Sequence, residues 1–201
     1  MNRLRWTRVF FAGLVAFAAA RADADEEQDL LATLQASVGV PQKCAACQQL
    51  RVIGTARSVP ALAALLGEER TSHAARYALE AMPCPEAGAA LREAADKTSG
   101  AIKAGLIDSL GWRRDVEAVS LLTPLLSDAD AIIASAAASA LGRIGGPEAI
   151  AALSAARDKV SPAVQSVVLE SLLQCAEQRM AAKDSSGAAA LYRSLGGGQL
   201  P

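Results

Sequence analysis

A leucine that recurs about every thirty residues constrains the fold of this chain more than any other feature. The intervals between its copies are 29, 31, 31 and 31 residues, and the copies are Leu50, Leu79, Leu110, Leu141 and Leu172. A repeat of this length with helical texture is typical of helix pairs stacked in a row, in which each pair packs only on its neighbours. The spacing therefore predicts an elongated helical array rather than a globular enzyme fold.

The residues around each leucine predict one helix whose apolar face packs on the next repeat. Four residues before the leucines stand Ala46, Ala75, Leu106, Ala137 and Val168, and three residues after them stand Ile53, Met82, Arg113, Ile144 and Cys175. Offsets of −4, 0 and +3 lie on one face of an α-helix. Small residues recur on this face, which allows one helix to lie close to its neighbour.

A second apolar pattern, which begins nine residues after each leucine, predicts the partner helix of each pair. Its clearest copies are Val59, Leu62 and Leu65 in the first unit and Val119, Leu122 and Leu125 in the third. Glycine and proline separate the helices, because glycine ends a helix readily and proline suits the first turn of the next. We expect such interruptions at Gly54, Met82–Pro85, Gly111 and Gly145–Pro147.

The first 24 residues predict export. Three arginines within the first eight residues precede an apolar run over residues 9–20, which is shorter than the roughly 20 residues that cross a bilayer. Ala22 and Ala24 supply the small residues of a signal-peptidase site, with cleavage expected after Ala24; Ala18–Ala20 is the alternative site. We therefore expect an extracytoplasmic protein, periplasmic or secreted, with no membrane span after cleavage.

The remaining pattern divides the chain into further segments. We expect an N-terminal capping helix over residues 25–40, repeats over 41–160, a modified terminal helix pair over 161–195 and a frayed tail over 196–201. The caps are expected because the end faces of a stacked array would otherwise leave apolar surface uncovered. The last pair is alternatively the start of further repeats.

The charge of the mature chain excludes nucleic acid as a partner. Residues 1–24 carry four arginines and one aspartate, so that their removal leaves 16 basic and 20 acidic side chains, a net charge of −4. A mildly acidic protein lacks the basic surface that neutralises phosphate groups. We expect a protein partner instead.

Cys44 and Cys47 form the one motif that suggests cofactor chemistry. Haem attachment requires a histidine directly after the second cysteine, where this chain has glutamine, and a zinc site requires two further ligands. Cys84 and Cys175 lie far away in repeat order, and the chain has a single histidine. The favoured interpretation is small, buried helix residues, with a disulfide or a metal or redox role as alternatives. We expect no cofactor and no metal.

No sequence motif indicates catalysis. The chain contains no P-loop, nucleophile elbow or HExxH, and we expect a protein without enzymatic activity. Ser72 is expected to cap the helix in which it lies or to bond locally, and Asp128 and Asp130 are expected to cap the first helix of the fourth unit.

Two short stretches are candidates for partner binding. Arginine, tyrosine and tryptophan are over-represented at the energetic centres of protein interfaces. The candidate residues are His73, Arg76 and Tyr77 in the second unit, and Trp112, Arg113 and Arg114 in the third. The alternative interpretation is ordinary packing and surface polarity for the first group, and a solvated turn for the second.

The fourth unit resembles a known repeat. Ala136–Gly145 (AAASALGRIG), followed by Pro147, Ile150 and Leu153, is similar to the short HEAT repeat of about thirty residues, often called HEAT-like or phycobilisome-lyase-type. The looser units extend the resemblance to about residues 42–160. Three other segments resemble exported HEAT-repeat proteins of planctomycete and verrucomicrobial type, namely Ser72–Glu80, Leu110–Asp115 and Leu173–Glu177.

The resemblance implies an all-α, right-handed superhelix of about four to five helix pairs, with a concave surface that binds another protein. It implies a scaffold or adaptor and carries over no catalytic residue. Bilin lyases of this repeat type work with cytoplasmic proteins, which the predicted signal peptide contradicts. HEAT-type di-iron hydroxylases need paired His-Glu motifs, and the single histidine of this chain excludes that activity. The alternative function is an accessory module of an extracytoplasmic redox or carbohydrate-processing enzyme, with Cys44 and Cys47 or the Trp112–Asp115 turn at a cofactor or glycan. A fragment of a longer protein is a third possibility.

Overall fold

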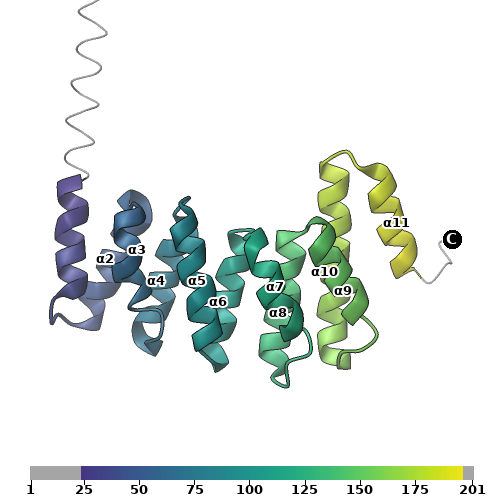
Figure 1. The fold of residues 1–201 in the computed structure, drawn as a ribbon, viewed down its shortest axis with the longest axis horizontal. Helices are drawn as coiled ribbons and strands as arrows, with labels where there is room; N and C mark the ends of the chain where they lie inside the picture. Colours follow the sequence, from purple (N-terminus) through teal and green to yellow (C-terminus); the bar gives the residue numbers. More distant parts are fainter. Residues whose placement is uncertain (1–23, 197–201) are drawn as a thin grey trace, which may run out of the picture.

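The computed structural model describes residues 24–196, which form a row of helices (Figure 1). No β-strand occurs within this range, and the predicted all-α fold class is confirmed. The predicted signal peptide and frayed tail fall almost entirely on residues outside the described range. Within that range, no helix is both long enough and apolar enough to cross a membrane.

The helices form two layers, one from the first helix and one from the second helix of each pair. The first helices are α2 (Val40–Ile53), α4 (Glu69–Ala81), α6 (Gly100–Trp112), α8 (Ala131–Ile144) and α10 (Pro162–Ala181). The second helices are η1 (Ala56–Ser58) with α3 (Val59–Ala63), α5 (Pro85–Lys97), η2 (Val116–Ala118) with α7 (Val119–Leu125), α9 (Gly146–Ala156) and α11 (Ser185–Leu195). Figure 1 shows α3, α5, α7 and α9 side by side in front of the first helices.

The recurring leucines lie at the centre of the core. All five are at most 1% exposed, as the periodicity requires. The second-helix pattern is buried as well, with Leu62, Leu122 and Leu153 fully covered. The core is one continuous cluster from Leu30 to Leu191, so the apolar side of each pair is covered by the pairs beside it.

The helix over residues 24–35 closes the N-terminal end of the row. It contributes leucines to the core and also a buried carboxylate, Glu27, which is 2% exposed. Glu27 accepts hydrogen bonds from the Thr55 backbone N–H (2.8 Å), the Thr55 hydroxyl (2.8 Å) and the Ser58 hydroxyl (2.6 Å). Burial opposes ionisation, but these bonds and the charge of Arg57 outweigh it and lower the pKa of Glu27. The helix is therefore joined to the first repeat by a specific polar contact.

Glycines bring the first helices of the later repeats into close contact. A Cβ on Gly111 would lie 2.7 Å from the Ala140 Cα, and one on Gly142 would lie 2.7 Å from the Ser171 Cβ. The expected helix interruption at Gly111 is wrong, because this residue lies inside α6 and is buried against α8. A helical glycine serves here to shorten the distance between two helix axes.

Two expectations about helix starts have different outcomes. The Asp130 carboxylate caps α8 by accepting from the Ile132 N–H at 2.9 Å, and Asp128 accepts from the Asp130 N–H at 2.9 Å. Ser72 does not cap α4, because that helix begins earlier, at Glu69, and Ser72 is buried inside it.

Candidate interaction surfaces

Three of the predicted residues meet on the outer side of the first helices, which we call the first-helix face. The His73 and Tyr77 rings are stacked with centroids 6.1 Å apart, and the His73 Nδ1 lies 2.9 Å from an Arg76 Nη2. The Arg51 guanidinium of α2 lies over the Tyr77 ring, 4.2 Å from the ring centroid. Arg76 also donates to the buried Ser109 hydroxyl of α6 at 3.0 Å. The cluster therefore spans three successive first helices.

Trp112 lies on the same face one repeat further on. Trp112 is 60% exposed, and the Arg143 guanidinium of α8 lies 4.6 Å from the centroid of its ring. Arg143 is in turn held by the Asp108 carboxylate at 2.6 Å. A guanidinium over an aromatic ring is favourable electrostatically, and the arrangement occurs in both places between adjacent repeats. Sequence reasoning missed Arg51 and Arg143, which stand 26 and 31 residues away from the rings they cover.

Arg113 lies apart from these residues and performs an internal task. Its guanidinium donates to the carbonyls of Leu79 (2.6 Å) and Cys84 (3.0 Å) and also contacts those of Glu80 and Met82. The last carbonyls of a helix have no partner within the helix, and Arg113 supplies one to α4 from the next repeat. The Nε of Arg113 is buried and has no hydrogen-bond partner among the described residues.

Arg114 is the last of the six candidates and occupies the turn itself. It is exposed and has a positive φ of 52°. In this turn, Trp112 and Arg114 are exposed and accessible to a partner, whereas the Arg113 side chain faces the end of α4.

A half-buried carboxylate lies between α4 and α6. Burial raises the pKa of Glu80, and the nearby Asp108 adds to the rise; a hydrogen bond from Ser109 and the charges of Arg76 and Arg51 partly oppose it. The α4–α6 junction therefore contains a half-buried carboxylate, whereas the α6–α8 junction combines the Arg143–Asp108 ion pair with the close contact of Gly111 and Ala140.

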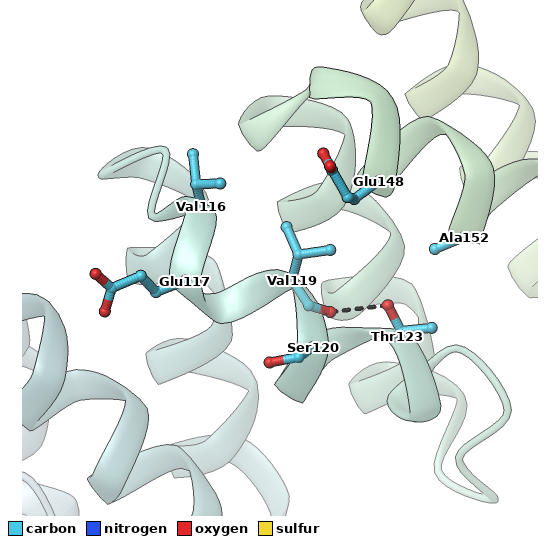
Figure 2. A pocket seen from close by; sticks show the side chains of 7 residues that line it. All are labelled: Val116, Glu117, Val119, Ser120, Thr123, Glu148 and Ala152. Atoms are coloured by element: carbon cyan, nitrogen blue, oxygen red, sulfur yellow. Dashed lines mark hydrogen bonds between the residues drawn. The ribbon is translucent and has the colours of Figure 1, made fainter.

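Grooves open on the other side of the array, which we call the second-helix face. One of them has a volume of about 530 Å³ and lies between η2–α7 and α9. It is lined by Val116, Glu117, Val119, Ser120, Thr123, Glu148 and Ala152. Figure 2 shows Val116 and Val119 from one side and Glu148 from the other around this groove. A volume of this size is in the range of small-ligand and side-chain pockets.

The neighbouring grooves on this face differ in their charge. A groove of about 400 Å³ between α3 and α5 contains the ion pair of Lys97 with Glu93, with 2.5 Å between Nζ and Oε1. A smaller groove of about 150 Å³ between α5 and η2 contains Arg92, which pairs with Asp115 and Glu117. The recurrence follows from the repeat itself, because these three successive junctions of second helices are built in the same way.

No disulfide joins the four cysteines, all of which lie within the described residues. All four are free thiols, and burial raises the pKa of Cys47 and of Cys175 to about 11. A thiol with such a pKa is almost entirely protonated at neutral pH and is a poor nucleophile. Among residues 24–196, no group of three or more His, Cys, Asp or Glu side chains is placed to hold a metal ion.

The family comparison agrees with the repeat pattern. Residues 88–173 match the family model of HEAT repeats. This range begins within α5 and ends within α10. No curated protein matches the chain. The match and the described helices together support a HEAT-repeat protein, with the fold of an all-α, HEAT-like helical-repeat solenoid.

Proposed function

We propose that the chain is an exported, non-enzymatic scaffold that binds another protein through the concave surface of its solenoid. HEAT repeats suggest a protein-interaction scaffold. The observation that carries the proposal is the recurrence of grooves between successive second helices. A groove of about 370 Å³ also lies between the first helices α8 and α10, but the second-helix face has several in succession, and we take it as the docking surface for this reason.

The size of the array supports the same role. Specific interfaces cover about 800 Å² on each partner, a small part of the 11911 Å² of accessible surface of the described chain. Each groove is held in place by a helix pair on either side, so that a partner meets a surface that is already ordered. A pre-ordered surface lowers the entropy cost of binding.

Site-specific photo-crosslinking tests the scaffold role. A benzoylphenylalanine at Val116 on the second-helix face should give a discrete protein adduct in the native cell envelope. The same group at Gln48, exposed on α2, serves as the control on the opposite face. The absence of a discrete adduct from both positions would contradict the scaffold role.

Export is tested separately. We expect the intact mass of the protein from its native cells to correspond to a chain that begins at Asp25, and the protein to be released with the periplasmic or secreted fraction. An uncleaved N-terminus in a cytoplasmic fraction would contradict export while leaving the binding role open to its own test.

A further inference from the structure

The groove between η2–α7 and α9 differs from its neighbours because its walls carry no cation. Neither η2, α7 nor α9 contains a lysine or arginine. Glu148 is exposed in the first turn of α9, and no ion pair joins it to another described residue. Glu117 is largely exposed and has Arg92 of α5 as its partner. The groove therefore presents negative charge that no neighbouring cation fully neutralises.

The walls between these carboxylates are apolar. Val116 is 68% exposed, and Val119 and Ala152 extend the apolar surface to the two sides of the groove. The Thr123 hydroxyl donates to the Val119 carbonyl at 2.8 Å (Figure 2), so its hydrogen is not offered to a ligand. Among the described second helices, Val116 is the one large apolar side chain that is mostly exposed.

The balance of charged side chains differs between the first and the second helices. The first helices α2, α4, α6, α8 and α10 contain seven Lys and Arg against five Asp and Glu, whereas the second helices η1, α3, α5, η2, α7, α9 and α11 contain four against five. The acidic side chains are concentrated locally, because a partner that docks in the groove beside Val116 meets Glu117 and Glu148 and no basic side chain in the walls. Electrostatic complementarity favours a basic segment there and disfavours an acidic one.

We propose that this groove binds an extended segment of a partner protein that places an aliphatic side chain against Val116, Val119 and Ala152 and a lysine or arginine beside Glu148. This inference rests on the scaffold role and adds the chemistry of the partner. The apolar contact anchors the segment, and the carboxylate selects its charge. The other grooves carry their own cations, Lys97 and Arg92, and offer no such selection.

A designed peptide tests the proposal. Adjacent packed helices lie about 8–10 Å apart, and an extended chain covers that distance in about three residues. The probe is therefore a fluorescein-labelled peptide of four Leu-Ser-Lys triplets. Its controls are peptides of four Leu-Ser-Glu and four Ser-Ser-Lys triplets. We expect the probe to bind the full chain about tenfold more tightly than either control, by fluorescence anisotropy.

Matched variants locate the binding. Glu148→Lys should weaken the probe about tenfold, whereas Glu86→Lys should change it less than about twofold. Both residues follow a proline in the first turn of a second helix, so the pair differs in groove and not in local structure. Val116→Ser should also weaken the probe, with Ile132→Ser as the control, because Ile132 is 67% exposed on the first helix α8.

The outcomes separate this inference from the scaffold role. Equal affinity for the three peptides, or equal effects of the two glutamate variants, would overturn the proposed selectivity. Self-association of the chain through Val116 would show that a second copy occupies the groove and would also overturn it. A protein that crosslinks from Gln48 but not from Val116 would retain the scaffold role and reject this groove.

Discussion

The junction between α4 and α6 and the junction between α6 and α8 join equivalent helices in different ways. The backbones of α6 and α8 run close together over much of their length, with Gly111 against Ala140. Those of α4 and α6 approach over a shorter stretch, where the Arg76 side chain lies against Gly105. Close packing of small residues resists change, because a tightly packed interior has little room to relax.

This difference divides the row into two parts. The part from α5 to α10 contains the close contacts of Gly111 and Gly142 and largely overlaps the HEAT match over residues 88–173. The part before it is joined to α6 through Arg76, Glu80 and Arg113. We call the part from α5 to α10 the glycine-packed part and infer that it is the more rigid of the two. It also contains the groove beside Val116. The following predictions test that difference.

Truncation of the recurring leucines should have the largest effect. We expect Leu141→Ala to cost about 4 kcal/mol and Leu79→Ala about 2–3 kcal/mol, since the cost of a cavity depends on how far its surroundings relax. Urea unfolding measures both. Equal costs would remove the packing difference between the two junctions, because both side chains are fully buried.

The cost of adding a methyl group to a glycine should be the next largest effect and should differ between the junctions. Gly142→Ala should cost about 2–3 kcal/mol, because its Cβ would meet the backbone and side chain of Ser171. Gly105→Ala should cost less than about 1 kcal/mol, since it would meet the movable end of Arg76. Gly67→Ala is the control, with open space around the new methyl group. A larger cost at Gly105 than at Gly142 would contradict the account.

The repeat core was predictable from the sequence, because burial follows helical periodicity. The leucines and the second-helix positions needed no knowledge of the neighbours. Gly111 was misread, since a glycine near a helix end serves equally to stop a helix or to admit its neighbour. Ser72 was misread for a similar reason: its side chain is suited to a cap, but Glu69 already starts the helix.

The interaction surfaces depend on distances between repeats, which the sequence does not specify. Three candidate residues, His73, Arg76 and Tyr77, do lie together, because they occupy neighbouring turns of one helix. The groove beside Val116 depends on the separation of α7 and α9. The inward direction of the Arg113 side chain could have been predicted from the sequence. Arg113 stands at an offset that is apolar in the other repeats, and that offset lies on the face of the first helix that packs on its neighbour.

Loss of the Arg113 guanidinium should weaken the polar junction. We expect Arg113→Met to cost about 1–2 kcal/mol, because carbonyls at the end of α4 lose their donors. Arg114→Lys should stay within about 0.5 kcal/mol as the exposed neighbour. Thermal unfolding followed by circular dichroism compares them, and an equal loss in both would show that Arg113 does not hold this junction.

Two carboxylates should give small pH effects of opposite sign. The lowered pKa of Glu27 contributes stability above its ordinary value of 4.5 that is lost as the pH falls through the folded pKa. The raised pKa of Glu80 has the reverse consequence, because the ionised form is disfavoured in the folded protein. At pH 7 we expect Glu27→Gln to destabilise and Glu80→Gln to stabilise, and both differences to shrink toward pH 4. Urea unfolding at both pH values measures them; effects of the same sign would contradict the two assignments.

Native-state hydrogen exchange, measured by mass spectrometry at low denaturant, tests most directly whether the glycine-packed part is the rigid one. The account predicts that amides of α6, α8 and α10 open together at the highest free energy, while those of α2 and α4 open separately at a lower one. Slower exchange in α2 and α4 than in α6 and α8, or a single opening shared by the whole row, would contradict it.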